Sequence, residues 1–224
     1  MFTRLLIGLD GGGAAAQALE QAIVLGRRFE ATLVVAYVRQ PEAARPPRQR
    51  RSDSGEVLEQ ARARVSASGL GVEIVTREGR PEVELAALAR NADAVLVGRR
   101  GRYAGNGGSG VLGTTVTALI RTAERTVIVC GGAAPSAMRV CAVAFDGRET
   151  SLRALALAAR FASISAGTVH VIHATIDRAM GTMVVGQAEA ALSLQGVAFE
   201  THLEHGTPGE AVARVVAQRG CDAL

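Results

Sequence analysis

The sequence predicts an α/β protein built on a doubly wound parallel sheet. Short apolar runs alternate with segments whose apolar residues recur at helical spacing. The apolar runs have no polar face, which is typical of parallel strands covered on both sides. The same alternation starts again near residue 139. Right-handed crossovers between such strands give helices on both faces of one sheet.

The N-terminal elements follow from this pattern. Residues 3–9 form a short apolar run, typical of a buried strand, and residues 11–13, all glycine, end it. Residues 14–29 carry apolar residues at near-helical spacing, and residues 31–38 are apolar and β-branched. A helix and a second strand are therefore expected. Residues 39–54 contain three prolines and five arginines, and we expect a flexible excursion there.

The remaining elements of the first half continue the alternation. They are a helix at 56–67, a strand at 71–76, a helix at 80–90, a strand at 92–97, a helix at 113–122 and a strand at 125–130. Pro81 falls in the first turn of its helix, where the missing N–H has no cost. Residues 98–110 are rich in glycine and are expected to form a loop.

The second half repeats the first. A strand at 139–145, a helix at 152–161 and strands at 169–174 and 197–202 follow the earlier order. The first strand of each half ends in an Asp-Gly pair, Asp10-Gly11 and Asp146-Gly147. The pattern predicts two tandem repeats: a complete domain at 1–132, a linker at 133–138 and a second domain at 139–224, shortened to three strands and three helices.

Composition excludes several function classes. The formal charge is +4 and all 25 basic residues are arginine, so a P-loop lysine or a Schiff-base lysine is excluded. Aromatic residues make up 3% with no tryptophan, which argues against a nucleic-acid module that stacks bases. No apolar run of about 18 residues indicates a membrane span. Three unpatterned cysteines favour a reducing, cytoplasmic location.

Ligands of doubly wound sheets bind beyond the carboxyl ends of the strands. In this chain that edge carries Asp10-Gly11, Val38-Arg39 and residues 98–101. The candidate site therefore lies there.

A glycine-rich segment near this edge is suited to phosphate. Gly98 and Gly101 precede a loop of small residues, and Gly113 opens a helix whose first residues are Thr114 and Thr115. Glycines let backbone amides approach phosphate oxygens, and a helix N-terminus adds free N–H groups. The neighbouring arginines, Arg99, Arg100 and Arg102, could neutralise the charge. A solvated surface loop is the alternative interpretation.

Several motifs together resemble the universal stress protein family. They are IGLDG at 7–11, AYV at 36–38, EGRP at 78–81, VLVGRRG at 95–101, LGT at 112–114 and TVIV at 126–129. The resemblance covers residues 3–131 and extends over 139–224 as far as the second repeat goes. It implies a Rossmann-like fold of the adenine nucleotide alpha hydrolase-like type, and a regulatory role in stress response. Because the sequence shows no evident general base, nucleophile or pair of metal-ligating carboxylates, fast nucleotide hydrolysis is not expected, and slow hydrolysis or autophosphorylation of a loop hydroxyl stays open.

The family's ATP-binding members carry the pattern G-x2-G-x9-G-[S/T]. Carried over, it falls on Gly98, Gly101 and Gly113-Thr114, with eleven intervening residues instead of nine. The extra length either bulges outward or marks a member that has lost the nucleotide. The resemblance further implies adenine and ribose contacts at Asp10 and Val38. The predicted ATP site, with Mg²⁺ as a plausible companion of the triphosphate, comprises Asp10, Gly11, Val38, Gly98, Arg99, Gly101, Gly113, Thr114 and Thr115.

Alternatives remain open at this point. A stress-family scaffold without nucleotide would act through protein contacts. In either case strand 125–130 is expected to leave an exposed sheet edge, and a homodimer that pairs through this edge is expected. An ATP pyrophosphatase would require serines that are absent after the first strand, and a flavin protein rests on fold analogy alone. The four histidines are expected to be structural or on the surface, because no carboxylate or cysteine nearby completes a metal-ligand set with them.

Overall fold

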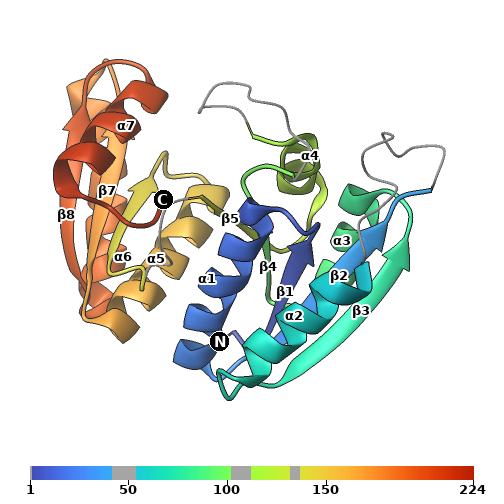
Figure 1. Cartoon of the computed structure of the whole chain (residues 1–224). Helices are drawn as coiled ribbons and strands as arrows, with labels where there is room; N and C mark the ends of the chain where they lie inside the picture. The colour runs from blue at the N-terminus through green and yellow to red at the C-terminus, as the bar shows by residue number, and fades with distance from the viewer. Residues whose placement is uncertain (1, 42–53, 102–111, 132–136) are drawn as a thin grey trace. The chain divides into compact units, whose positions relative to one another are not determined.

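In the described residues of each half of the chain, strands and helices alternate (Figure 1). The computed structural model describes residues 2–41, 54–101, 112–131 and 137–224. These fall into two units, residues 1–135 and residues 136–224, which we call the first and second unit.

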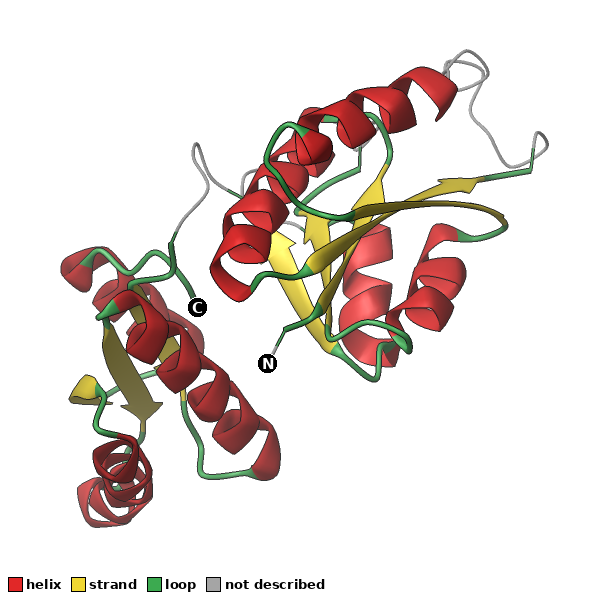
Figure 2. Cartoon of the chain, turned by 90° about the horizontal axis from the view of Figure 1, so that it is seen from below, coloured by secondary structure: helices red, strands yellow, loops and turns green. Residues whose placement is uncertain are grey.

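The first unit holds one parallel sheet of five strands in the order β3-β2-β1-β4-β5. Its elements are β1 (Arg4–Leu9), α1 (Gly13–Phe29), β2 (Thr32–Arg39), α2 (Ser54–Ser66), β3 (Val72–Glu78), α3 (Pro81–Ala89), β4 (Ala94–Gly98), α4 (Thr114–Thr122) and β5 (Thr126–Cys130). This confirms the predicted α/β class. Helices lie on both faces of the sheet (Figure 2).

Burial on both faces explains why the central strands are apolar throughout. In β1, Leu5 and Ile7 face one side and Leu6 the other, and all three are fully buried. Leu6 packs in a cluster with Leu85 of α3 and Leu119 of α4. Replacing such leucines with charged residues would leave a charge unpaired in the core.

The carboxyl ends of β1, β2 and β4 meet at one edge of this sheet. Gly8 lies in register with Ala36 of β2 and with Val97 of β4. β3 extends two residues beyond the predicted end, because Arg77 and Glu78 continue the pairing with β2 although the apolar pattern stops at Thr76.

The second unit holds a parallel sheet of three strands in the order β6-β7-β8. Its elements are β6 (Val140–Ala144), α5 (Glu149–Ser165), β7 (Thr168–Ala174), α6 (Arg178–Gln195), β8 (Ala198–Glu204) and α7 (Pro208–Arg219). Cys141 of β6 also forms a parallel bridge with Ala223. Helix α5 begins before residue 152 and ends after residue 161, so the expected helix is confirmed but was drawn too short.

The two sheets share details of hydrogen bonding. After β1, Asp10 Oδ1 accepts from the Gly12 N–H at 2.8 Å, and after β6, Asp146 Oδ1 accepts from the Arg148 N–H at 3.0 Å. The glycine that follows each aspartate has positive φ, 76° at Gly11 and 78° at Gly147. The Asp-Gly pairs noted in the sequence therefore form the same turn.

A second shared device ties the start of each sheet to a distant aspartate. Asp93 Oδ2 accepts from the Thr3 N–H at 2.6 Å and from the Arg4 N–H at 2.9 Å. In the second unit, Asp222 accepts from the Arg139 and Val140 N–H groups at 3.2 and 2.9 Å. Each carboxylate thus accepts hydrogen bonds from the backbone at the N-terminal end of the first strand of its unit, β1 or β6.

Replacing Asp93 with alanine is expected to lower the free energy of unfolding of the first unit by about 1–2 kcal/mol, because two backbone N–H groups lose their acceptor. Burial opposes ionisation of Asp93, but hydrogen bonds from Thr3 and Arg4 outweigh it and lower its pKa. The stabilisation is therefore present above about pH 4, the unfolded pKa of aspartate, and is lost as pH falls through the lower folded pKa.

Tyrosine fluorescence during urea unfolding would measure this difference, since Tyr37 and Tyr103 are the two tyrosines and both belong to the first unit. An Asp93→Asn variant keeps one acceptor oxygen and should lose less. An equal effect of Asp93→Ala at pH 3 and pH 7 would contradict the role of the carboxylate.

None of the helices among the described residues combines the length and the apolar composition that crossing a bilayer requires.

Candidate functional site

A cavity of about 460 Å³ lies in the first unit where β1, β2 and β4 end. It falls within the size range of small-molecule sites, roughly 300–1,000 Å³. The starts of α3 and α4 complete its wall. Its lining residues are Gly8, Leu9, Asp10, Ala15, Ala36, Tyr37, Val38, Arg39, Gln40, Pro81, Leu85, Val97, Gly98, Arg100, Gly101, Leu112, Gly113, Thr114, Thr115 and Val116.

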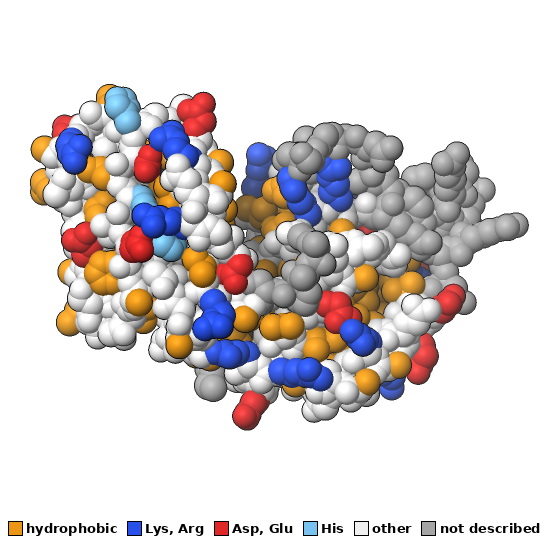
Figure 3. Space-filling model, turned by 60° about the vertical axis from the view of Figure 1, so that its left-hand side comes forward, with side chains coloured by type: hydrophobic (Ala, Val, Ile, Leu, Met, Phe, Trp, Pro, Cys, Tyr) orange, Lys and Arg blue, Asp and Glu red, His pale blue; other side chains and the backbone are white. Residues whose placement is uncertain are grey.

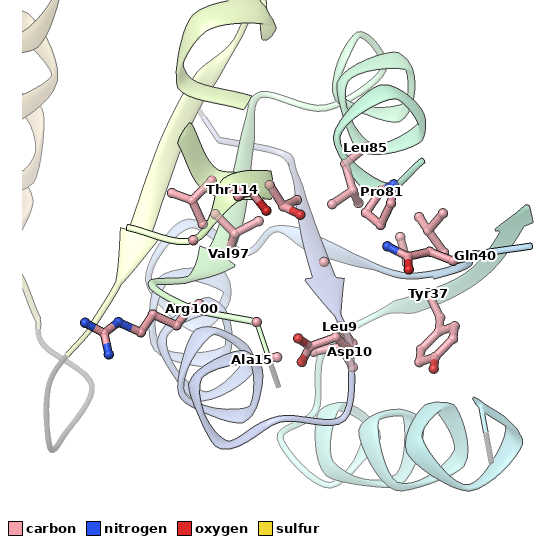
Figure 4. Close-up of a pocket in the computed structure, with 18 of the residues that line it drawn as sticks. Leu9, Asp10, Ala15, Tyr37, Gln40, Pro81, Leu85, Val97, Arg100 and Thr114 are labelled. Atoms are coloured by element: carbon pink, nitrogen blue, oxygen red, sulfur yellow. The ribbon is translucent and has the colours of Figure 1, made fainter. Parts of the chain in front are cut away.

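Apolar side chains make up much of the cavity wall. Leu85 and Val116 reach it from the core between the sheet and helices α3 and α4. Tyr37, which is in register with Leu9, adds an aromatic ring from β2 (Figure 4). This part of the cavity suits a flat apolar group such as a nucleobase.

Asp10 supplies the carboxylate of the cavity. The positive φ of Gly11 turns the chain so that the Gly12 N–H can donate to Asp10 Oδ1. Figure 4 shows Asp10 at the end of β1, with its carboxylate oxygens pointing away from Tyr37. Among the residues that line the described cavity, Asp10 is the one acidic side chain.

The N-terminus of α4 opens on the same cavity. Gly113 is its N-cap, with an extended backbone and no side-chain hydrogen bond. The first N–H groups of a helix have no partner within the helix and carry a partial positive charge. Thr114 and Thr115 follow and add two hydroxyl groups to the cavity wall.

A backbone hydrogen bond joins the segment that follows β4 to the start of α4. The Gly113 N–H donates to the Arg99 carbonyl at 3.0 Å. A Cβ at Gly113 would lie 3.4 Å from the Arg100 Cα. The strand end and the helix start, separated by residues 102–111 in the sequence, are thus in direct contact.

Gly98 is required for packing. A Cβ at this position would lie 2.4 Å from the Ala14 carbonyl carbon and 2.7 Å from the Ala15 nitrogen, both in the first turn of α1. Gly101 instead faces the cavity, where a Cβ would lie 3.3 Å from Asp10 Oδ2. The two glycines therefore have different reasons to lack a side chain.

The arginines divide between the cavity and its surroundings. Arg39 and Arg100 are among the lining residues, and the Arg100 side chain extends away from Asp10 (Figure 4). Arg99 is not among them: its aliphatic stem lies beside Gly131, where a Cβ would be 3.2 Å from Arg99 Cδ.

The structure gathers seven of the nine predicted site residues around the cavity: Asp10, Val38, Gly98, Gly101, Gly113, Thr114 and Thr115. Gly11 and Arg99 do not line it. Sequence reasoning missed Tyr37, Gln40 and Leu85, which reach the cavity from β2 and α3. The longer glycine loop and Arg102 lie outside the described residues.

Burial disfavours thiolate chemistry at the cysteines. It raises the pKa of Cys130 to about 12, and burial together with the Asp222 charge raises that of Cys141 to about 12. Burial also raises the pKa of Cys221. A thiolate nucleophile is therefore disfavoured at each of them.

The expectation that no nearby carboxylate completes a metal-ligand set with the histidines was wrong. In the second unit, one ligand atom each of His170, Glu200 and His202 lies within 4.8 Å of the others. The sequence separates His170 from His202 by 32 residues, and only the register of β7 with β8 brings them together.

Comparison with known proteins gives a consistent result. The model of the Universal stress protein family matches residues 1–131. No curated protein matches the chain.

Solved structures extend the comparison at the level of fold. A universal stress protein from Archaeoglobus fulgidus DSM 4304 aligns over 97% of this chain and 84% of its own, with a TM-score of 0.78 and 18% identity. A functionally unknown protein from Pseudomonas aeruginosa PAO1 aligns over 98% and 79%, with a TM-score of 0.72 and 16% identity.

A smaller protein matches a part of the chain. The universal stress protein UspA from Lactobacillus plantarum aligns over 58% of this chain and 98% of its own, with a TM-score of 0.51 and 20% identity. At such identities the likeness concerns the fold.

Proposed function

Because the chain belongs to the universal stress protein family, we propose that the cavity of the first unit binds an adenine nucleotide, ATP, and that the protein is an ATP-linked regulator in stress response. The observation that carries this proposal is the hydrogen bond from the Gly113 N–H to the Arg99 carbonyl. It holds an uncapped helix N-terminus at the mouth of a cavity that is apolar on its other side.

The two ends of the cavity suit the two ends of a nucleotide. The base and ribose would lie near Asp10, Tyr37 and Val38, where a ring and a hydrogen-bonding carboxylate are available. The phosphates would lie on the N–H groups at the start of α4, with the hydroxyls of Thr114 and Thr115 as further donors.

The donors present fit Mg²⁺ bound through the triphosphate. Mg²⁺ usually keeps several waters and takes one or two carboxylates together with phosphate oxygens. Asp10 supplies one carboxylate and the threonines supply hydroxyl oxygens. The ion would neutralise phosphate charge.

The described lining residues include no histidine, no cysteine and no second carboxylate to serve as a general base. They support binding and regulation more than rapid hydrolysis.

Calorimetric titration with ATP, AMP and cAMP, with and without Mg²⁺, tests the proposal. ATP should bind at micromolar concentration and more tightly than either monophosphate, because only the triphosphate spans the cavity and the helix N-terminus. Absence of ATP binding at millimolar concentration would overturn the proposal. The protein would then be a scaffold acting through protein contacts.

Replacing Thr114 with valine is expected to weaken ATP binding by about tenfold, the loss of roughly one hydrogen bond to a charged group. Thr122→Val is the matched control, since Thr122 lies in the last turn of the same helix and its hydroxyl donates to the Ala118 carbonyl. AMP binding should change less than ATP binding. Equal losses for the two variants would exclude a specific role of the Thr114 hydroxyl.

We also propose that residues 139–224 are a second repeat of the first domain, joined by a linker at 133–138. The shared order of strands, the two Asp-Gly turns and the paired roles of Asp93 and Asp222 support it. A cytoplasmic location and pairing of two copies through β5, an edge strand of its sheet, remain predictions.

A further inference from the structure

Two histidines and a glutamate converge on one face of the second sheet. His170 of β7 is in register with Glu200 of β8, and His202 lies two residues farther along β8. Because partners in register share a face and strand residues alternate, all three side chains are on the same face. His170 Nδ1 lies 3.0 Å from His202 Nε2 and 3.8 Å from Glu200 Oε2.

The cluster is half buried under α7. Ile172, next along this face of β7, packs against Ala211 and Val215 of that helix. The side chain of His170 is 6% exposed, whereas that of Glu200 is 49% exposed. His170 thus forms the floor of the cluster and Glu200 its open rim. Figure 3 shows histidine side chains at the surface among acidic and basic ones.

Burial and a neighbouring guanidinium both disfavour protonation of the two imidazoles. Burial lowers the pKa of both histidines, and the Arg219 guanidinium on α7 lowers both further. Glu200 acts in the opposite direction but is itself paired with Arg219, at 3.2 Å. A neutral imidazole offers a lone pair, which is the form that binds a metal ion.

We propose that His170, His202 and Glu200 form a binding site for a divalent transition metal ion, represented by Zn²⁺. Two imidazole nitrogens and one carboxylate oxygen are a donor set that zinc takes with water in the fourth position. Mg²⁺ and Ca²⁺ prefer oxygen donors throughout and do not fit this set.

The distances are close to those that zinc requires. Two nitrogens bound to a tetrahedral Zn²⁺ lie about 3.3 Å apart, given bonds of about 2.05 Å. The two imidazole nitrogens lie 3.0 Å apart, so they need to separate only slightly. Glu200 must move more, and its exposed side chain is free to do so.

Binding of the metal ion would replace the hydrogen bond between the two imidazoles with two metal–nitrogen bonds. Without metal, one of the two facing nitrogens donates its proton to the other. With metal, both facing nitrogens carry lone pairs, so the donor imidazole moves its proton to its other nitrogen and no net proton is released. The ion would then link β7 to β8 through side chains as well as backbone.

The test is a zinc titration of the purified full chain after chelator treatment, measured by competition with a chromophoric chelator. One equivalent of Zn²⁺ should bind at micromolar concentration or tighter. His202→Gln and Glu200→Gln should each weaken binding at least about tenfold, the loss that even an outer-shell change brings. Bound Zn²⁺ should also raise the unfolding temperature of the wild type but not of His202→Gln.

Three controls separate this site from adventitious binding. His205→Gln changes an exposed histidine outside the cluster and should leave the affinity unchanged. Cys221→Ser should also leave it unchanged, and a Co²⁺ spectrum without a thiolate charge-transfer band would agree. Circular dichroism confirms that each variant is folded.

A further variant is expected to tighten zinc binding instead of weakening it. Arg219→Gln removes the guanidinium that competes for Glu200 Oε2, so it should tighten zinc binding a few-fold, the scale of an exposed ion pair. Failure of the wild type to bind one equivalent, or equal affinity of the wild type and a folded His202→Gln variant, would overturn the proposal.

Discussion

Gly98→Ala is expected to lower the free energy of unfolding of the first unit by about 3 kcal/mol, the upper end of the usual cost of overpacking. The added methyl would lie 2.4 Å from the Ala14 carbonyl carbon, and its nearest neighbours are all backbone atoms of α1. Backbone in a helix cannot rotate away as a flexible side chain can. Either α1 or β4 must shift, although both contact the buried core.

Urea unfolding followed by tyrosine fluorescence measures the change, since both tyrosines belong to the first unit. Gly13→Ala is the matched control. It adds the same methyl in α1 with nothing within 4 Å, and it favours the helix. We expect its effect to be neutral or slightly stabilising. A Gly98→Ala variant as stable as Gly13→Ala would show that the first turn of α1 moves freely.

The order of strands and helices could be predicted because burial imposes a pattern on the sequence. Runs such as those of β1 and β2 are apolar on both faces, and α1 repeats its buried residues at helical spacing. The first and last residues of helix α6 could not be predicted from the sequence. Its apolar residues do not form one stripe: Met183 is 70% and Leu194 is 90% exposed, so the periodicity is weak.

The candidate site could be predicted only in part. Ligands of parallel sheets bind at the strand ends, and from this rule Asp10, Val38, Gly98 and Gly113 were expected at one edge of the sheet. In the structure these residues line one cavity. The direction of a side chain just after a strand is not fixed by alternation, which is why Arg99 was expected there although it lies beside Gly131. Gly98 was interpreted as part of a phosphate-binding site, although its packing against the α1 backbone is enough to require a glycine there.

The histidine cluster could not be predicted at all. His170 and Glu200 lie on different strands, separated by α6. Whether they share a face depends on the register between β7 and β8, and a slip of one residue would place Glu200 on the other face. No pattern in the sequence fixes that register by itself.

Gly101→Asp is expected to weaken ATP binding at least about 100-fold while leaving the fold intact. The new carboxylate would extend from a Cβ 3.3 Å from Asp10 Oδ2, at the mouth of the cavity. Gly101 also adjoins the N-cap of α4, since a Cβ at Gly113 would lie 3.5 Å from the Gly101 nitrogen, so the new charge would stand next to the proposed phosphates. Two like charges about 4 Å apart repel by roughly 4 kcal/mol at an effective dielectric constant of 20. Calorimetric titration with ATP and Mg²⁺ measures the loss.

Gly101→Asn separates charge from size, because asparagine has the shape of aspartate without its charge. If phosphates lie at Gly101, the asparagine variant should retain far more affinity than the aspartate variant, and raising the salt concentration should narrow the gap through screening. Equal losses in the two variants would mean that the space beside Asp10 matters more than its charge. ATP affinity unchanged in both would place the triphosphate elsewhere than the start of α4 and would contradict the proposed orientation of the nucleotide.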